Sequence, residues 1–78
     1  MRDVNERANR LTRREREVFR LVAAGRLNKQ IAATLGTTEK TIKVHRGRVM
    51  TKMCAVSIAD LVRMFDLLEG ASPSLGLK

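Results

Sequence analysis

The sequence predicts an all-α fold of four helices, and three observations support this prediction. The chain has 78 residues, which is room for one domain with a modest core. Its apolar residues are almost all aliphatic, because Phe19 and Phe65 are the only Phe, Tyr or Trp side chains. These aliphatic residues recur at the three- and four-residue spacing of helices, and capping residues and glycines separate the segments.

The first clear helix is predicted at about residues 13–24. Thr12 precedes it and Glu15 follows three residues later, which is the pattern of a capping box, where each side chain accepts a hydrogen bond from a backbone N–H. Val18, and further apolar residues at helical spacing, give the segment one apolar face. Gly25 can take the left-handed conformation that ends a helix.

A second, short helix is predicted from Asn28, a good N-cap, to Gly36. A third is predicted at about 39–53, with Thr38 as its N-cap. A short turn that holds a glycine between two short helices is typical of a helix-turn-helix.

The segment 39–53 has two different faces. At about 100° per residue, Ile42, Val49 and Met53 fall within one narrow sector and form an apolar seam. The opposite face is polar or basic apart from one valine and one glycine. It carries Lys40, Lys43, Val44, Gly47 and Thr51.

A fourth helix is predicted at about 57–69, where Ser57 and Asp60 form the Asp version of a capping box. Its apolar stripe toward the core consists of Ile58, Leu61, Val62, Phe65 and Leu68. Met64 and Leu67 lie off this stripe and need another cover.

The remaining segments flank a helix-turn-helix domain at residues 12–70. Residues 1–11 are polar, with three apolar residues at helical spacing, and we interpret them as a linker or the end of an interdomain helix. Residues 71–78 contain Pro73 and Gly76 and are predicted to be a flexible tail.

Positive charge is concentrated in the middle of the chain. The net charge is +8, and residues 26–56 alone contribute +6 of it. Such an excess indicates an anionic partner: nucleic acid, anionic lipid or an acidic protein. A membrane surface fits less well, because the apolar seam of helix 39–53 is needed by the core and leaves no large apolar face for lipid.

Several other classes are excluded. A lone Cys54 allows no internal disulfide and suits a reducing cytoplasm, and the chain start has no apolar signal core, so a cytoplasmic protein is expected. No apolar run approaches the ~20 residues of a membrane span. His45 and Cys54 stand too far apart on one helix to be a metal-ligand pair. No catalytic set or cofactor motif is present, so neither an enzyme nor a bound metal or cofactor is expected.

An ordered set of residues resembles the LuxR-type helix-turn-helix domain, the output module of NarL/FixJ-class response regulators, and comes nearest to its FixJ-like members. The resemblance covers about residues 11–68 and rests on Leu11-Thr12, Arg14-Glu15, Glu17-Val18, Gly25, Asn28-Lys29, Ile31-Ala32, Leu35, Thr41 to His45 and Met53. The chain departs from the pattern at Leu27, where Ser or Thr is common, and at Cys54, where Gly is usual. It departs again at Gly47, where relatives often carry a polar or basic groove-contacting residue; a closer approach of the backbone to DNA would compensate.

The resemblance implies sequence-specific binding of double-stranded DNA by the output domain of a transcription regulator, in the context of a two-component response regulator. Helix 39–53 would enter the major groove, and helix 57–69 would make the contact of a homodimer on DNA. Further expected partners are an upstream receiver domain and RNA polymerase. The alternative is a protein-interaction module whose basic helix-turn-helix surface binds an acidic partner.

The candidate site residues fall into three groups. Expected at base edges or the groove wall are Lys43, Val44, Gly47 and Lys40. Expected at phosphates are Asn28, Lys29, Thr38, Thr41, His45, Arg46, Arg48, Thr51 and Lys52. Expected in the dimer contact are Asp60, Met64 and Leu67. Plainer roles stay open: Lys43 as a solvated surface lysine, Val44 as a surface valine, and Asn28 and Thr38 as helix caps without a ligand.

Overall fold

The structure, a computed structural model, describes residues 2–69, so the predicted tail at 71–78 lies outside the described residues. Over residues 2–69 the fold is all-α, as predicted, without a strand. It has one helix more than the predicted four. The helices are α1 (Arg2–Asn9), α2 (Arg13–Ala23), α3 (Asn28–Leu35), α4 (Glu39–Met53) and α5 (Ile58–Leu68).

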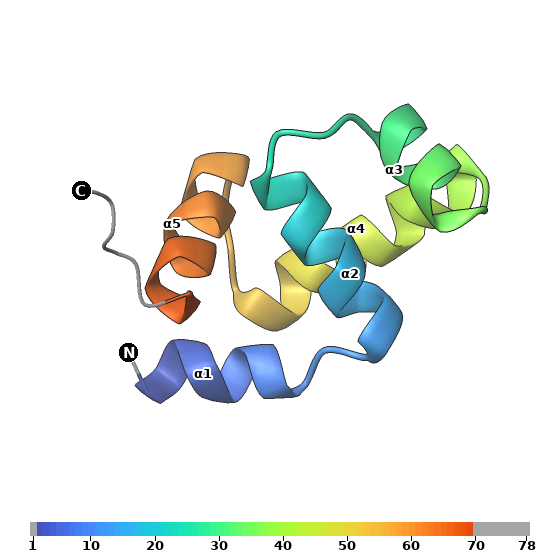
Figure 1. The fold of residues 1–78 in the computed structure, drawn as a ribbon. Coiled ribbons are helices and arrows are strands. Elements are labelled where there is room, and N and C mark those ends of the chain that lie inside the picture. Colours follow the sequence, from blue (N-terminus) through green and yellow to red (C-terminus); the bar gives the residue numbers. More distant parts are fainter. Residues whose placement is uncertain (1, 70–78) are drawn as a thin grey trace.

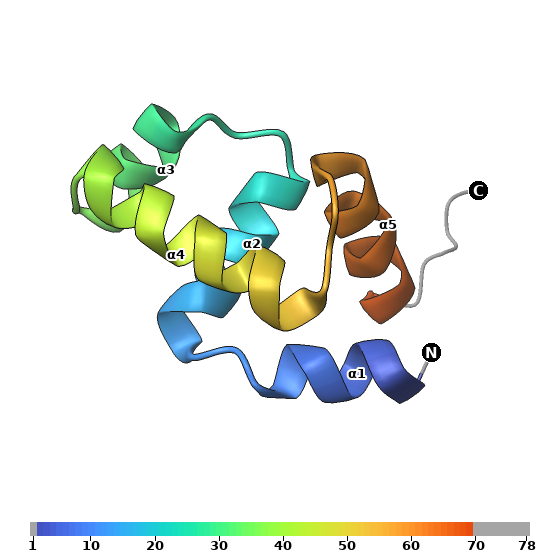
Figure 2. The same ribbon diagram turned by 180° about the vertical axis from the view of Figure 1, so that it is seen from behind.

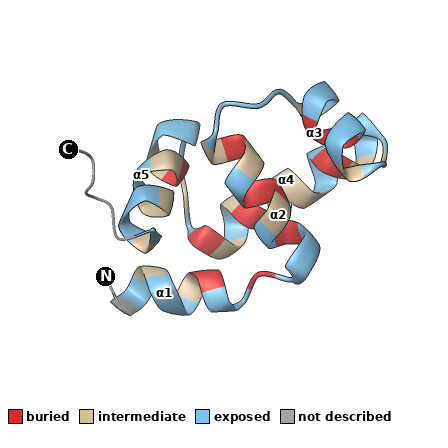
Figure 3. Cartoon of the chain, viewed as in Figure 1, coloured by how far each residue is buried: buried red, intermediate tan, exposed pale blue. Residues whose placement is uncertain are grey.

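Helix α2 is the centre of the fold and packs against α3, α4 and α5 (Figure 1). From behind, α4 is seen to cross α2 at a steep angle, with α3 at one end and α5 toward the other (Figure 2). The facing sides of α2 and α4 are buried and their outer sides exposed (Figure 3). The core residues on these helices and on α3 and α5 are Val18, Phe19, Val22, Ile31, Ala32, Ile42, Val49, Met53 and Leu61.

The additional helix, α1, lies in the segment 1–11 that we interpret as a linker or the end of an interdomain helix, and it packs on the domain. Ala8 and Leu11 are buried in the core, and Val4 packs against it. The Arg7 guanidinium donates to the carbonyl of Met53 at the end of α4 (Nη1–O 3.1 Å). The helical spacing of the apolar residues is therefore used within this domain. Whether α1 also continues from another domain stays a prediction.

The predicted caps of α2 and α4 are confirmed. Glu15 N–H donates to Thr12 Oγ1 (3.1 Å) and Thr12 N–H donates to Glu15 Oε1 (2.9 Å), which completes a capping box. Thr38 Oγ1 accepts from Thr41 N–H (3.1 Å) at the start of α4. Both helices therefore start where their polar side chains satisfy free backbone donors.

The prediction of Asn28 as the N-cap of α3 is wrong. Leu27 occupies the cap position and has no side-chain acceptor, while Gln30 Oε1 accepts from the Leu27 N–H (2.9 Å). Asn28 is the first helical residue, and its side chain is turned toward Arg46 of α4 instead. A tertiary hydrogen bond has therefore taken the polar side chain that the local pattern assigned to capping.

The cap of α5 is half as predicted. Asp60 N–H donates to Ser57 Oγ (3.0 Å), but the Asp60 carboxylate accepts from Val56 N–H (3.1 Å), not from Ser57. Val56 precedes the N-cap Ser57, so this bond holds the backbone one residue before the cap.

The apolar face of α5 is rotated relative to the prediction. Leu61 is buried and Phe65, Leu68 and Met64 pack against the core, whereas Ile58 is 36% exposed. Met64 was expected off the core, and this expectation is wrong. Phe65 sets the rotation, because its ring meets Phe19 edge to face at 5.3 Å between centroids. Leu67 is exposed, as expected.

Three left-handed residues end helices. Gly25 (φ +87°) follows α2 and Gly36 (φ +70°) caps α3, as the sequence predicts. Cys54 (φ +57°) caps α4 in the same conformation with a side chain in place. A Cβ disfavours this region of backbone conformation, so Cys54 is a strained end of α4.

A buried ion pair joins α2 to α4. Lys52 Nζ donates to Glu15 Oε1 (2.8 Å), and Glu15 is 2% exposed. Burial acts to raise the pKa of the Glu15 carboxyl, but hydrogen bonds from the Lys52 ammonium and the Thr12 backbone N–H lower it by more, so the pKa lies below the ordinary value of 4.5. The folded state therefore holds this carboxylate charged.

We expect Glu15→Gln to reduce the free energy of unfolding by about 1–2 kcal/mol at neutral pH, because the cap acceptor remains but the charged bond to Lys52 is lost. Since the folded pKa is lowered, the stabilisation is present above pH 4.5 and is lost as the pH falls below that value. Urea unfolding as a function of pH measures both effects. Glu17→Gln is the control, because Glu17 forms a more exposed pair with Arg14 (3.3 Å). Equal stabilities of the two variants would contradict the assignment.

We expect Cys54→Gly to raise the free energy of unfolding by about 1 kcal/mol, because glycine has no Cβ to disfavour the left-handed cap. Cys54→Ala, which loses the thiol but keeps the Cβ, should leave stability close to that of the unaltered chain. Thermal unfolding compares them, with a rise of roughly 4 °C expected for glycine alone. Similar melting temperatures for the two variants would show that Cys54 is not strained.

Candidate nucleic-acid interface

The two faces of α4 are as the sequence predicts. Ile42, Val49 and Met53 are fully buried, each at 0% exposure. On the outer face Lys43 is exposed and Val44 is 48% exposed. Because the apolar seam packs on α2, the outer face of this helix is presented to solvent along its length.

The outer face of α4 holds all four candidate base or groove contacts and two of the nine candidate phosphate contacts. One continuous exposed surface of this helix consists of Lys40, Lys43, Val44, Gly47, Arg48 and Thr51, and we call it the outer face of α4. Three of these side chains are cationic and none is acidic, so the surface has a positive potential.

Asn28 and Arg46 fix α3 against α4. Arg46 Nη1 donates to Asn28 Oδ1 (2.8 Å), and both residues are partly buried. The geometry of the helix-turn-helix thus depends on a polar bridge as well as on Ile31 and Ile42 in the core. Arg46 has further guanidinium N–H groups besides Nη1, so this bond does not exclude a phosphate contact.

The threonine hydroxyls at the start of α4 are already engaged. Thr38 Oγ1 accepts from the Thr41 backbone and also donates to Thr41 Oγ1 (3.0 Å). Thr38 is exposed and Thr41 half-buried, beside the exposed Lys40. Lys29, on α3, is exposed as well and lies on the same helix-turn-helix.

Two candidate phosphate contacts point inward. The Lys52 ammonium is bound to Glu15 and lies 3.3 Å from the Arg10 carbonyl, so its hydrogen bonds are made within the domain. His45 is half-buried, and its Nδ1 is buried without a hydrogen-bond partner. Both side chains lie on the flank of α4 next to the apolar seam, and Glu15 of α2 draws the Lys52 ammonium inward. The geometry gives Lys52 a structural role.

A shallow open hollow lies on the outer face of α4. Its lining comes from Val44, Gly47, Arg48, Thr51 and Lys52. Gly47 lies in it without a side chain, and a Cβ placed there would meet no atom within 4 Å. These residues stand at i, i+3, i+4, i+7 and i+8, and this helical spacing predicts that they share one surface. The spacing does not predict that the surface is hollow.

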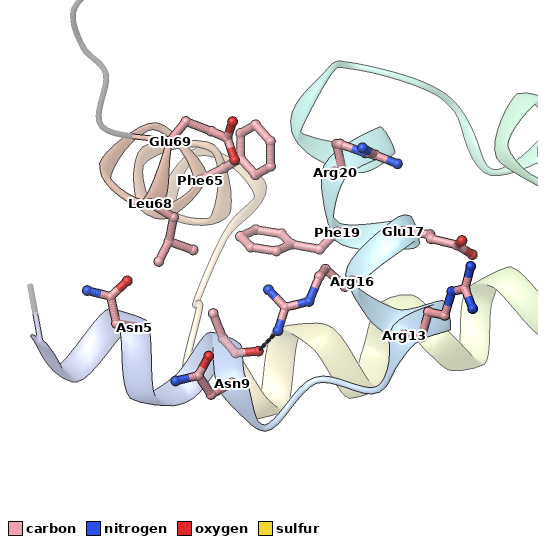
Figure 4. A pocket seen from close by; sticks show the side chains of 11 residues that line it. Asn5, Asn9, Arg13, Arg16, Glu17, Phe19, Arg20, Phe65, Leu68 and Glu69 are labelled. Atoms are coloured by element: carbon pink, nitrogen blue, oxygen red, sulfur yellow. Dashed lines mark hydrogen bonds between the residues drawn. The ribbon is translucent and has the colours of Figure 1, made fainter.

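A second, more enclosed cavity of about 400 Å³ lies between α1, α2 and α5 (Figure 4). Phe19 and Phe65 form its apolar side, and Arg13, Arg16 and Arg20 are at its edge with Glu17 and Glu69. The Arg16 guanidinium is turned to the Ala8 carbonyl (2.8 Å). No residue of α4 lines this cavity. It is therefore separate from the helix-turn-helix surface.

The dimer candidates lie on one flank of α5 but differ in exposure. Leu67 is 45% exposed, and Met64 is half-buried against the core. The Asp60 carboxylate is occupied by Val56 N–H and by Arg63 Nη1 (2.7 Å). Leu67 is thus the candidate with most surface free for a partner.

The described residues contain neither a candidate metal cluster nor a helix that could span a membrane. Within residues 2–69, His, Cys, Asp and Glu nowhere form a group of three that could hold a metal ion. None of the helices formed by this part of the chain has the length and apolarity needed to cross a membrane.

The family of bacterial regulatory proteins named luxR matches residues 9–65 of the chain. Nodulation protein W of Bradyrhizobium diazoefficiens is 55% identical over 58 residues, which are 74% of this chain and 26% of that protein. The transcriptional regulatory protein FixJ of Azorhizobium caulinodans is 44% identical over 72 residues, 92% of this chain and 34% of that protein. The chain thus spans about a quarter to a third of the length of these relatives.

A solved structure of a FixJ protein is similar to this chain in both fold and sequence. The crystal structure of full-length FixJ from B. japonicum superposes with a TM-score of 0.80 and 38% sequence identity. The superposition covers 91% of this chain and 35% of that protein. The similarity therefore extends over α1–α5 and includes the additional helix α1 at least in part.

Proposed function

Since the chain belongs to the luxR family of bacterial regulatory proteins and is a DNA-binding domain of that family, we propose that it reads operator DNA by placing the outer face of α4 in the major groove. One observation carries this proposal. Helix α4 buries Ile42, Val49 and Met53 completely and leaves Lys43 and Val44 exposed on the opposite side. A helix held by one face and free on the other fits the major groove.

The residue roles follow from chemistry and exposure. Lys43 can donate to the N7 and O6 acceptors of guanine, and Val44 can pack on a thymine methyl. Lys29, Lys40, Arg46 and Arg48 supply cations for flanking phosphates, which fix the register of the protein without reading sequence. Thr38, Thr41, Thr51 and Asn28 add neutral hydrogen-bonding groups, and Gly47 lies between the base-reading residues.

The regulatory context is that of its relatives. Response regulator protein TodT of Pseudomonas putida is 43% identical over 67 residues, 30% of that protein's length. We infer that the full-length protein is a cytoplasmic two-component response regulator with a receiver domain and that it acts on RNA polymerase. Support comes from the similarity to FixJ and from the share of each relative that this chain leaves uncovered.

A second copy of the chain is the proposed cover for α5. The exposed Leu67, the half-buried Met64 and Asp60 lie on one flank of that helix. A symmetric dimer contact through this flank would place two α4 helices on half-sites about one DNA turn, or a multiple of it, apart.

The alternative is a module that binds an acidic protein through the same basic surface. Both functions predict salt-sensitive binding, because both use the same cations. They differ in sequence dependence: only a DNA reader prefers some duplexes over others of equal length and charge.

The proposal is tested by binding of the 78-residue chain to duplexes selected from a random pool, over a series of salt concentrations. We expect affinity to fall linearly with salt on a logarithmic scale, and Lys43→Ala to cost about 1–3 kcal/mol and relax the preference at one base pair. Arg20→Ala is the control, because it removes the same charge from an exposed residue at the cavity away from α4. Absence of any sequence preference, or tighter binding to polyglutamate than to every duplex, would refute DNA reading.

We expect Leu67→Glu to abolish cooperative binding to a duplex with two half-sites, because a charge would enter the apolar dimer contact. Binding to a single half-site should persist, and the free energy of unfolding should change by no more than about 0.5 kcal/mol at this exposed position. Val56→Glu adds the same charge at a residue 89% exposed, outside the flank, and is the control. Equal cooperativity in both variants would remove α5 as the dimer helix.

A further inference from the structure

We infer that the open hollow at Gly47, between Val44 and Thr51 on α4, receives the 5-methyl group of one thymine in each half-site. This inference rests on the proposed reading of duplex DNA by α4 and names what one part of that surface reads. Its new element is the specificity role of a residue that has no side chain.

Gly47 is unfavourable for the helix in which it lies. It stands in the interior of the 15-residue helix α4, where glycine lowers the folding equilibrium constant by a factor of about two to five relative to alanine. Its φ is not positive, unlike that of Gly25 and Gly36, so the backbone does not require glycine here.

Packing within the domain does not require glycine at this position either. A Cβ built on Gly47 would meet no atom within 4 Å, and the residue is exposed. Any small side chain could therefore stand there in the free protein at a gain in stability. Neither the backbone nor packing within the domain thus accounts for glycine here, and its role is assigned to a molecule that approaches the outer face of α4.

The chemistry of the hollow indicates which group approaches. Its lining includes Val44 one helical turn before Gly47 and Thr51 one turn after it. Lys52 contributes only its aliphatic stem, because its ammonium is bound to Glu15. Arg48 lines the hollow as well, but most of the lining surface is apolar, so an apolar group fits it better than a phosphate does. The thymine methyl is the apolar group that a base pair presents in the major groove.

The position of Gly47 also separates its role from that of Lys43. Lys43 is exposed and carries a donor for base acceptors, whereas Gly47 has no side chain and contributes no side-chain donor. The outer face of α4 would thus combine one donor-based contact with one contact that depends on shape alone.

The test uses the 78-residue chain and the duplex that it selects from a random pool, with each thymine replaced in turn by deoxyuridine. This replacement removes the methyl group and keeps every hydrogen-bonding group. We expect one replacement per half-site to weaken binding by about fourfold, the effect of one buried methyl. Gly47→Ala places a methyl group in the hollow. The variant should therefore bind the thymine duplex at least about fourfold more weakly than the unaltered chain does, and it should no longer bind the deoxyuridine duplex more weakly than the thymine duplex.

Thermal unfolding separates this effect from damage to the fold. Gly47→Ala should raise the melting temperature by roughly 4 °C while it lowers affinity. Thr34→Ala, at an exposed position in α3, is the control that improves helix propensity and leaves α4 unchanged, and it should not alter the response to deoxyuridine.

Three results would overturn the inference. One is sequence-specific binding that no thymine replacement weakens. Another is an unchanged deoxyuridine effect in Gly47→Ala together with its loss in Val44→Ala, which would assign the methyl contact to Val44 alone. The third is the absence of any binding to duplex DNA. This result alone would also refute the proposed function, whereas the first two would refute only the role of Gly47.

Discussion

The buried carboxylate of Glu15 connects the start of α2 with the end of α4, and it holds the two helices against each other. One oxygen, Oε1, accepts both the Thr12 backbone N–H and the Lys52 ammonium. A charge in a core of this kind is stable only when its hydrogen bonds are complete. Since Lys52 lies on the flank of α4, the pair is a polar contact between α2 and α4 beside the apolar seam.

The helices with strong local signals could be predicted from the sequence, because their boundaries depend on residues close together in the chain. Helix α4 begins and ends as its Thr38 cap and apolar spacing predict, and Gly25 and Gly36 take the left-handed conformation. The failures have a tertiary cause. Asn28 is drawn to Arg46, and Met64 is rotated into the core with Phe65. Arg46 lies 18 residues after Asn28, and Phe65, which turns together with Met64, meets Phe19 of α2, so a local pattern reveals neither contact.

The site could be predicted to the same degree and for the same reason. The exposure of Lys43 and Val44 follows from the period of the helix once Ile42 is assigned to the core. The inward turn of Lys52 depends on Glu15, 37 residues earlier, and no spacing rule predicts it. The hollow at Gly47 requires knowledge of what surrounds a missing side chain. Such knowledge comes from coordinates.

The bond from Arg7 to the Met53 carbonyl has a consequence for where the domain begins. Met53 is the last residue of α4, so α1 covers the carboxyl end of the helix whose outer face we propose to read DNA. Removal of α1 would uncover Ala8's neighbours in the core and free that carbonyl. The packed domain therefore includes α1 and Leu11, and a boundary drawn at Thr12 would divide it.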